Sequence, residues 1–478
     1  MWENAWDVLN LRRKRFELHG MRIHLIAIGG SAMHNFALAL ADAGHHVTGS
    51  DDQIFEPSRG RLAAAGLLPE QDGWHPELLT SDIDVVILGM HARPDNPELV
   101  RAQEMGLTLQ SYPEFLRMAT EAKKRMVVAG SHGKTTVTSM ILHAWRGAGE
   151  QTDLMVGAQL EGFDRMVHLD PATSWAVIEG DEYLSSPIDR RPKFLWYGPH
   201  VTVITGIAWD HVNVFPTEES YIDQFREYLR TVEPGGTVVH CTEDRLLAGV
   251  VRDVQPERPD IHWVGYQTPS HRPTPTGSLV TFDDQDPMPV ALLGAHNMQN
   301  LAAARASCQA MGMSGADFDR HIADFTGAAK RLEVAHEDGS FVAFRDFAHA
   351  PSKLRATQAS VVGQFPERTV TAVFELHTFS SLNKAFIPQY AGAMDAVDHA
   401  VVYFDPAVVA HKRLPALDAD FVAKAFGRPD LEVLTSVGAL EARLQRVPTA
   451  QHVLLLMSSG RFGGADLIPT RRPATSSQ

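Results

Sequence analysis

The sequence predicts an α/β protein in which three successive domains each contain a mostly parallel sheet. Short apolar, strand-like runs alternate with helix-length segments along nearly the whole chain, and this alternation is typical of right-handed βαβ units. The chain has 478 residues, more than one hydrophobic core normally holds. The alternation also restarts twice, after the polar segment EAKKR (121–125) and near Gly327. We therefore expect three domains.

The first domain, residues 21–118, is expected to be Rossmann-like. Its glycine pair at the end of the first strand, with Asp51 following, is half of a dinucleotide-binding fingerprint. Ser31 and Met33 occupy positions that the full fingerprint needs, so a nicotinamide enzyme is kept only as an alternative. The predicted strands of this domain are RIHLIAIGG (22–30), HHVTGSDD (45–52), IDVVILG (83–89) and LTLQS (107–111).

The second domain, residues 122–326, is expected to be a central P-loop ATPase domain. The strand MVVAG (126–130) leads into a glycine-rich turn, and an apolar-periodic helix begins at Thr135. Such a turn directs backbone N–H groups and a helix N-terminus at a bound anion. The loop is shorter than the standard pattern, because Val128 stands where glycine is usual. The residues expected to bind ATP are Gly130, Ser131, His132, Gly133, Lys134, Thr135 and Thr136.

Two side chains of this loop have predicted chemical roles. Lys134 is expected to reach the terminal phosphates, and the Thr135 hydroxyl is expected to ligate Mg²⁺. ATP and Mg²⁺ are therefore the predicted cofactors. The alternative is a helix N-terminus with a tight glycine turn that binds no nucleotide.

The third domain, residues 327–468, is expected to be a second Rossmann-like, doubly wound sheet. The Pro-rich segment TPSHRPTPTG (268–277), which precedes it, has the composition of a surface connection. The predicted strands of the third domain are FVAFRDFA (341–348), RTVTAVFEL (368–376), HAVVYFDP (399–406), LEVLTS (431–436) and QHVLLLMSSG (451–460).

Composition narrows the class of function. The formal net charge of −15 and the lack of a basic stripe argue against a nucleic-acid partner. No apolar run has the length of a membrane span, so membrane insertion is not expected. Cys241 and Cys308 stand in no metal-binding spacing. We expect a cytoplasmic protein; the oligomeric state, and whether residues 1–20 are native, stay open.

Six motifs occur in an order that resembles the Mur ligases. The resemblance extends from Met21 to about Asp466. It implies an ATP-dependent ligase that joins a carboxylate to an amine in building the peptidoglycan precursor. The six motifs are AGSHGKTT (129–136), IEGDEY (178–183), WDHVNVF (209–215), GAHNMQN (294–300), AKRLEV (329–334) and DFAHAP (346–351).

The resemblance also implies roles for single residues. Glu179 and His211 would hold Mg²⁺ with Thr135, although each has a plain structural alternative: a solvated strand-end acid for Glu179 and a core histidine bonded to Asp210 for His211. His349 or His377 would accept or orient the proton of the attacking amine, unless both are structural. The residues implied to contact the nucleotide are His296, Asn297, Asn300, Arg331 and Asp346. For Asn297 the alternative is helix capping, and for Arg331 it is a surface pair with Glu333.

Some members of the family carry a carbamylated lysine where this chain has Arg226. The branch that acts directly on UDP-N-acetylmuramate lacks this lysine, as this chain does. The first domain also resembles that branch, in the segments IGGSAM (28–33), GSDD (49–52) and GMHARPDNPEL (89–99). The resemblance thus implies UDP-N-acetylmuramate as a substrate.

The amino substrate is less clearly indicated. VGAQLEGFD (156–164), the segment 178–200 and MSSGRFGG (457–464) resemble the member that attaches the tripeptide L-Ala-γ-D-Glu-meso-diaminopimelate in peptidoglycan recycling. ELHTFSSLN (375–383) is closer to the member that adds L-alanine. We expect the murein tripeptide, with Asp189, Arg190 and Arg191 positioned for its extra carboxylates. L-Alanine is the alternative, and an ATP-hydrolysing switch without ligation is the alternative of another class.

Overall fold

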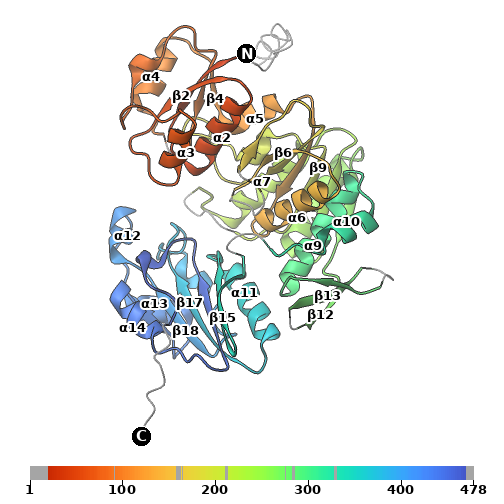
Figure 1. The fold of residues 1–478 in the computed structure, drawn as a ribbon, viewed down its shortest axis with the longest axis vertical. Helices are drawn as coiled ribbons and strands as arrows, with labels where there is room; N and C mark the ends of the chain where they lie inside the picture. The colour runs from red at the N-terminus through yellow and green to blue at the C-terminus, as the bar shows by residue number, and fades with distance from the viewer. Residues whose placement is uncertain are drawn as a thin grey trace.

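The computed structural model describes residues 20–90, 92–157, 163, 165–209, 214–274, 276–282, 286–327 and 331–469. Three main sheets with flanking helices follow one another along the chain (Figure 1). The predicted α/β class with three domains is therefore confirmed. The strands of each sheet lie inside the expected ranges 21–118, 122–326 and 327–468, while the boundaries themselves stay a proposal.

The N-terminal domain is a four-stranded sheet of order β2-β1-β3-β4 in which every pair is parallel. The strands are β1 (Arg22–Ile26), β2 (His46–Ser50), β3 (Val85–Leu88) and β4 (Leu109–Ser111). The helices are α2 (Ser31–Asp42), α3 (Ser58–Ala64), η1 (Pro76–Leu78), α4 (Pro97–Glu104) and α5 (Tyr112–Ala119). At the carboxyl edge of this sheet the Gly29 N–H donates to Asp51 Oδ2 over 2.8 Å.

The central domain contains a seven-stranded sheet of order β11-β10-β9-β5-β8-β6-β7. Its inner strands are continuous apolar runs because helices cover both faces. The strands are β5 (Lys124–Ala129), β6 (Asp153–Met155), β7 (Val167–His168), β8 (Trp175–Glu179), β9 (Val201–Ile204), β10 (Thr237–Cys241) and β11 (His262–Tyr266). The helices are α6 (Lys134–Gly147), η2 (Lys193–Trp196), α7 (Glu218–Arg230), α8 (Arg245–Val254), η3 (Gln255–Glu257), α9 (Ala295–Ala310) and α10 (Gly315–Ile322).

A small antiparallel sheet completes the central domain. It consists of β12 (Ser270–Thr274), β13 (Gly277–Thr281) and β14 (Met288–Val290). β12 lies within the Pro-rich segment that the sequence suggested was only a connection. Because β12 is an edge strand, Pro273 is tolerated there: proline lacks an N–H, and one side of an edge strand needs no partner.

The C-terminal domain is a six-stranded sheet of order β15-β16-β20-β17-β18-β19, parallel except for the β15–β16 hairpin. The strands are β15 (Glu333–Asp338), β16 (Phe341–Asp346), β17 (Thr369–Glu375), β18 (His399–Tyr403), β19 (Glu432–Leu434) and β20 (His452–Met457). The helices are α11 (Pro351–Gln364), η4 (Ile387–Tyr390), α12 (Pro406–His411), α13 (Ala419–Phe426), α14 (Val437–Leu444) and η5 (Phe462–Gly464).

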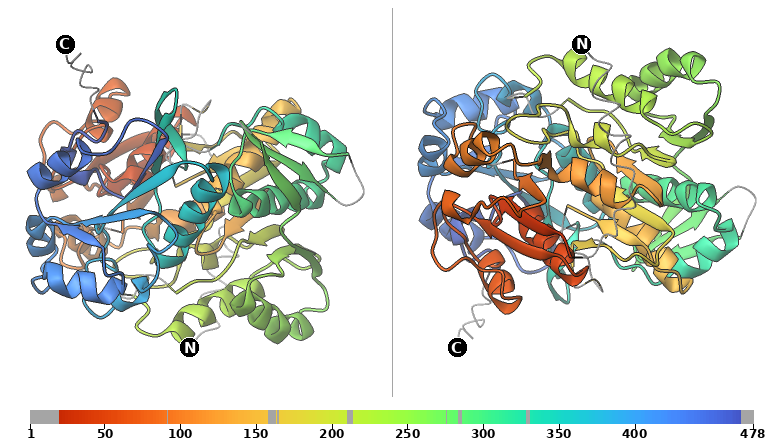
Figure 2. Two further views of the ribbon diagram at one scale, coloured as in Figure 1. Left: turned by 90° about the horizontal axis from the view of Figure 1, so that it is seen from below. Right: turned by 90° about the horizontal axis from the view of Figure 1, so that it is seen from above.

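The cores of the domains are not equally separate. One continuous core joins the N-terminal and central domains, for example through Phe36 and Phe115 on one side and Tyr197 on the other. The C-terminal sheet has its own core on each face. In both views of Figure 2 the central domain lies to one side of the other two. None of the helices in the described ranges has the length and apolar character of a membrane span.

Candidate active site

The loop after β5 has the backbone geometry of an anion-binding turn. Gly130 has φ +123° and Gly133 has φ +79°, values that favour glycine. A Cβ atom at Gly130 would lie 2.3 Å from Thr205 Oγ1, and one at Gly133 would lie 2.4 Å from Asn300 Oδ1. α6 begins at Lys134, one residue before the expected start, so the N–H groups of its first turn have no partner within the helix. This backbone fits a phosphate group.

Lys134 extends over the loop and is held in its charged form. Its Nζ atom donates to the Gly130 carbonyl over 2.8 Å and to Glu182 Oε2 over 2.7 Å. Burial alone would lower the pKa of Lys134, but Glu182, Asp181 and Glu179 outweigh it and raise that pKa. The ammonium is therefore available to a phosphate, which would compete with Glu182 for it.

Glu182 was not among the predicted site residues, although it lies in the quoted motif IEGDEY. Its second oxygen accepts from the Tyr221 hydroxyl over 3.2 Å, and the Tyr221 hydroxyl is 2.8 Å from Ser131 Oγ. Ser131 Oγ in turn accepts from the Ala208 N–H over 2.8 Å. This buried network fixes the phosphate loop against the loop after β9.

The two described residues of the predicted metal site are in contact. Thr135 Oγ1 donates to Glu179 Oε1 over 2.9 Å, and Glu179 Oε2 accepts from the Gly157 N–H over 2.9 Å. Glu179 ends β8 and is 5% exposed, so it is not a solvated strand-end acid. Burial and the nearby Asp181 raise the pKa of Glu179, and together they outweigh Lys134, which acts in the opposite direction.

This donor set suits a hard cation, since a carboxylate and a hydroxyl supply oxygen ligands next to a phosphate loop. His211, the third predicted ligand, lies outside the described residues. Across the described ranges, no three His, Cys, Asp or Glu side chains form a metal cluster. A cation at Thr135 and Glu179 would therefore complete its shell with phosphate oxygens, water or the predicted His211.

The start of α9 connects the phosphate loop to the C-terminal domain. Asn300 Oδ1 lies against Gly133, as the close approach of a Cβ there indicates. His296 Nδ1 is 2.9 Å from Ser360 Oγ on α11, and burial lowers the pKa of His296, so it is neutral near pH 7. Asn297 does not cap the helix: the cap is Gly294, and the Asn297 amide donates to the Leu293 carbonyl over 3.0 Å.

The C-terminal domain contributes Arg331 and Asp346. The Arg331 guanidinium lies 4.6 Å from the centre of the Phe347 ring. Burial lowers the pKa of Arg331, while Asp346 and Glu179 act in the opposite direction, which places Arg331 within electrostatic reach of the central-domain acid. Asp346 accepts from the Leu332 N–H at 2.9 Å, the Ala348 N–H at 2.7 Å and Thr357 Oγ1 at 3.1 Å. It thereby fixes the turn between β16 and α11.

The two candidate proton acceptors have different surroundings. His349 lies in the turn before α11, and its Nδ1 is 2.8 Å from the Phe347 carbonyl. Its Nε2 is 3.5 Å from the Nζ atom of Lys353, which lies in the first turn of α11. His377 Nδ1 is 3.6 Å from Glu375 Oε1 at the end of β17. Their roles in proton transfer stay predictions.

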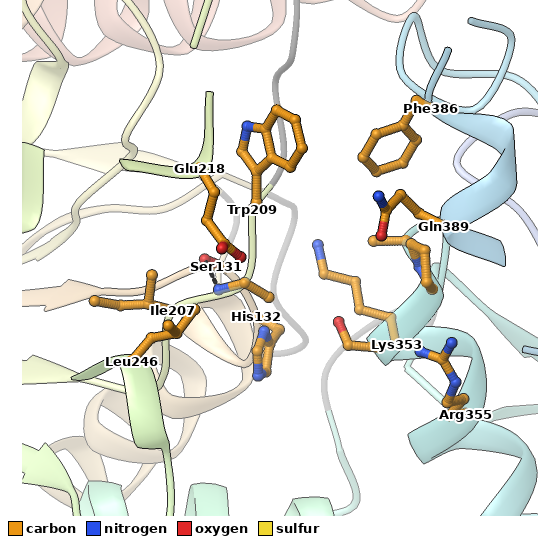
Figure 3. A pocket seen from close by; sticks show the side chains of 14 residues that line it. Ser131, His132, Ile207, Trp209, Glu218, Leu246, Lys353, Arg355, Phe386 and Gln389 are labelled. Carbon is orange, nitrogen blue, oxygen red and sulfur yellow. Dashed lines mark hydrogen bonds between the residues drawn. The ribbon is translucent and has the colours of Figure 1, made fainter. Parts of the chain in front are cut away.

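A cleft of about 290 Å³ separates the phosphate loop from the C-terminal domain (Figure 3). The rings of Trp209 and Phe386 meet edge to face across it, with ring centres 6.3 Å apart and an angle of 80° between the ring planes. Burial, together with Lys353 and Lys134, lowers the pKa of His132 to about 4, so this loop histidine is neutral near pH 7. The cleft is lined by Ser131, His132, Ile207, Ala208, Trp209, Glu218 and Leu246 from the central domain, and by Ala350, Pro351, Ser352, Lys353, Arg355, Phe386 and Gln389 from the C-terminal domain.

Two family profiles match this chain. Residues 22–124 match the profile "Mur ligase family, catalytic domain", and residues 128–308 match "Mur ligase middle domain". Together they cover more than half of the sequence. The chain belongs to the Mur ligase family. This Mur ligase is therefore an ATP-dependent carboxylate–amine ligase of peptidoglycan synthesis, as the motif order implied.

The individual relatives of this Mur ligase differ in amino substrate. A UDP-N-acetylmuramate–L-alanine ligase from an Arthrobacter species is 30% identical, over 80% of each chain. The structure of a murein peptide ligase from Psychrobacter arcticus has a TM-score of 0.66 at 22% identity, over 93% of this chain and 97% of that one. A UDP-N-acetylmuramate–alanine ligase structure from Thermotoga maritima has a TM-score of 0.69 at 20% identity, with the same coverage. The two structures share the fold of this Mur ligase.

Proposed function

We propose that this Mur ligase joins an amino substrate to the lactyl carboxylate of UDP-N-acetylmuramate, and that L-alanine is the first candidate for the amine. The observation that carries the proposal is the phosphate loop, in which Lys134 lies over a glycine turn and Thr135 contacts Glu179. The Arthrobacter relative supports both substrates, because its name states them.

The side chains of the site suit the activation of a carboxylate. A carboxylate is a poor electrophile, and transfer of the γ-phosphoryl group of ATP would convert it to an acyl phosphate. Lys134 and Arg331 would offset the charge of the transferring group. A neutral amine would then attack the acyl carbon, and inorganic phosphate would leave from the tetrahedral intermediate.

We propose that Thr135 and Glu179, with the predicted His211, hold Mg²⁺. Bound there, the cation would neutralise phosphate charge next to the loop. Of the remaining predicted residues, Asn300 lies against Gly133 of the loop, while His296 and Asn297 lie at the start of α9 and Arg331 and Asp346 lie in the C-terminal domain. We propose that they bind the nucleotide when the two domains approach each other.

The murein tripeptide is the second candidate amine. Its support is the cleft, where Lys353 and Arg355 provide two cations for more than one carboxylate. The loop that the sequence suggested for this task gives less support. Arg191 is bonded to Asp189 at 2.9 Å and lies 4.3 Å from the Trp196 ring, so it is held within the loop. L-Alanine, the alternative in the sequence analysis, is therefore placed first.

The choice between L-alanine and the tripeptide is tested by incubating the protein with ATP, Mg²⁺, UDP-N-acetylmuramate and one of the two amines at a time. We expect a product with the mass of UDP-N-acetylmuramate plus L-alanine less water, and a kcat/KM for L-alanine at least about tenfold above that for the tripeptide, about 1.4 kcal/mol. A preference of the same size for the tripeptide would reverse the order of the candidates. ATP turnover that ignores both co-substrates would indicate a switch instead. Since ATP and UDP-sugars are cytoplasmic metabolites, we also propose a cytoplasmic location.

A further inference from the structure

We propose that Lys353 binds the carboxylate of the amino substrate and is a specificity-determining residue of this enzyme. The inference rests on the proposed ligase function and deepens it. It adds a residue that none of the six motifs contains, since Lys353 lies just after DFAHAP.

The backbone at Lys353 is held in place by hydrogen bonds. It lies in the first turn of α11, and the turn before this helix is held by Asp346, which accepts the Ala348 N–H and the Thr357 hydroxyl. Its side chain extends into the cleft toward the wall formed by the central domain (Figure 3). Because this backbone is held in place, the positions that the Lys353 ammonium can reach are limited, and a bound carboxylate would be held in a defined place.

The charge of Lys353 reaches the phosphate loop. Burial is the main cause of the lowered pKa of His132, and the positive charge of Lys353 is the next largest cause. Lys134, the cation of the loop itself, is paired with Glu182, while Lys353 Nζ lies 3.5 Å from His349 Nε2 in its own domain. Lys353 therefore brings a further positive charge to the cleft from the C-terminal domain.

The lining of the cleft suits an amine that also carries a carboxylate. Its charged residues, in the part of the chain that the structure describes, are two cations, Lys353 and Arg355, and one acid, Glu218, on the opposite wall. A carboxylate could bind the cations while the amine faces the central domain. Trp209 and Phe386 provide apolar surface for a short side chain.

A carboxylate fits Lys353 better than a phosphate of ATP does. The N–H groups at the start of α6 and Lys134 already form a phosphate site on the central domain. The amine must approach the activated carboxylate close to that site, so the rest of the amino substrate would lie in the cleft toward the C-terminal domain, from which Lys353 projects. A charge-assisted hydrogen bond there would select amines that carry a carboxylate.

The test uses Lys353→Met, which keeps the length of the side chain and removes its charge, and Lys353→Arg, which keeps the charge. Lys424→Met, an exposed lysine on α13 of the same domain, is the matched control. For each variant, KM and kcat are measured with the amine that the wild type accepts, L-alanine or tripeptide, and with the same amine after amidation of its carboxylates. The KM for ATP and the melting temperature are measured in parallel.

We expect Lys353→Met to raise the KM for the carboxylate-bearing amine about tenfold or more, with the KM for ATP and the use of the amidated amine unchanged. Lys353→Arg should recover part of the loss, and Lys424→Met should match the wild type. An equal loss with both forms of the amine, or a raised KM for ATP instead, would overturn the proposal. A wild type that ligates no amine at all refutes the proposed function itself, which is a distinguishable result.

Discussion

Thr135 Oγ1 and Glu179 Oε1 lie 2.9 Å apart, although 43 residues separate them in the sequence. The contact arises because β5 and β8 are parallel neighbours, so that the loop after one strand and the end of the other meet at the carboxyl edge of the sheet. Hydroxyl and carboxylate oxygens next to a phosphate loop form the most specific part of the proposed magnesium site.

The metal assignment predicts the behaviour of two substitutions. Glu179→Gln and His211→Ala should each raise the Mg²⁺ concentration needed for half-maximal activity by about tenfold, because each removes a ligand while the phosphate loop remains. Activity is measured across a Mg²⁺ titration, with the exposed Glu219→Gln as the control. An unchanged Mg²⁺ dependence in both variants would remove these residues from the metal site.

Lys134 is expected to act through its charge. Lys134→Ala should lower kcat by about a hundredfold or more, the usual effect of removing a key electrostatic group. The substitution also leaves the buried Glu182 without its ion pair, so stability is checked by thermal unfolding. If the single variant unfolds, Lys134→Met combined with Glu182→Gln removes the unpaired charge. Turnover near that of the wild type in a folded variant would contradict the role of Lys134.

The phosphate loop offers a comparison between two glycines. Gly133 and Gly149 have nearly the same φ, +79° and +81°, but a Cβ atom at Gly149 would meet nothing within 4 Å. Alanine at either position should therefore cost about 1–2 kcal/mol of backbone strain, while only Gly133→Ala should also push Asn300 away and weaken ATP binding. Calorimetric titration with ATP measures the difference. Equal ATP affinity of the two variants would show that the contact with Asn300 does not shape the loop.

The lowered pKa values of two histidines predict how the stability of the fold depends on pH. Burial lowers the pKa of His132 and of His452 to about 4 in the folded protein, against 6.5 when exposed. The unfolded chain thus binds more protons between these values, and stability falls as pH drops from about 6.5 toward 4, by up to about 1.4 kcal/mol per pH unit for each histidine. Urea unfolding at pH 7, 6 and 5 measures this slope. His452→Gln should make the slope shallower, and an unchanged slope would refute the contribution of His452.

Much of the fold could be predicted because its signals are local. Buried parallel strands are continuous apolar runs, and GSHGKTT encodes its turn through glycine. The short strands β6 and β7 and the exposed hairpin strand β15 carry no such signal, since their pairing depends on neighbours distant in sequence. The Pro-rich β12 was taken for a connection for the same reason.

The site was predictable where motifs exist and not where it depends on domain packing. Thr135 and Glu179 lie in motifs, and their contact follows from strand order. Lys353 and Phe386 enter the cleft only because α11 and η4 face the central domain, and neither residue belongs to one of the six motifs. Glu182 lies within a quoted motif, but its pairing with Lys134 became visible only in three dimensions.

We propose above that this enzyme activates the lactyl carboxylate of UDP-N-acetylmuramate as an acyl phosphate. The most direct test labels both oxygens of that carboxylate with ¹⁸O and follows one turnover with ATP, Mg²⁺ and the amine. The account predicts one ¹⁸O atom in the released inorganic phosphate and one in the new amide. Unlabelled phosphate, with both ¹⁸O atoms remaining in UDP-N-acetylmuramate while ATP is consumed, would contradict it.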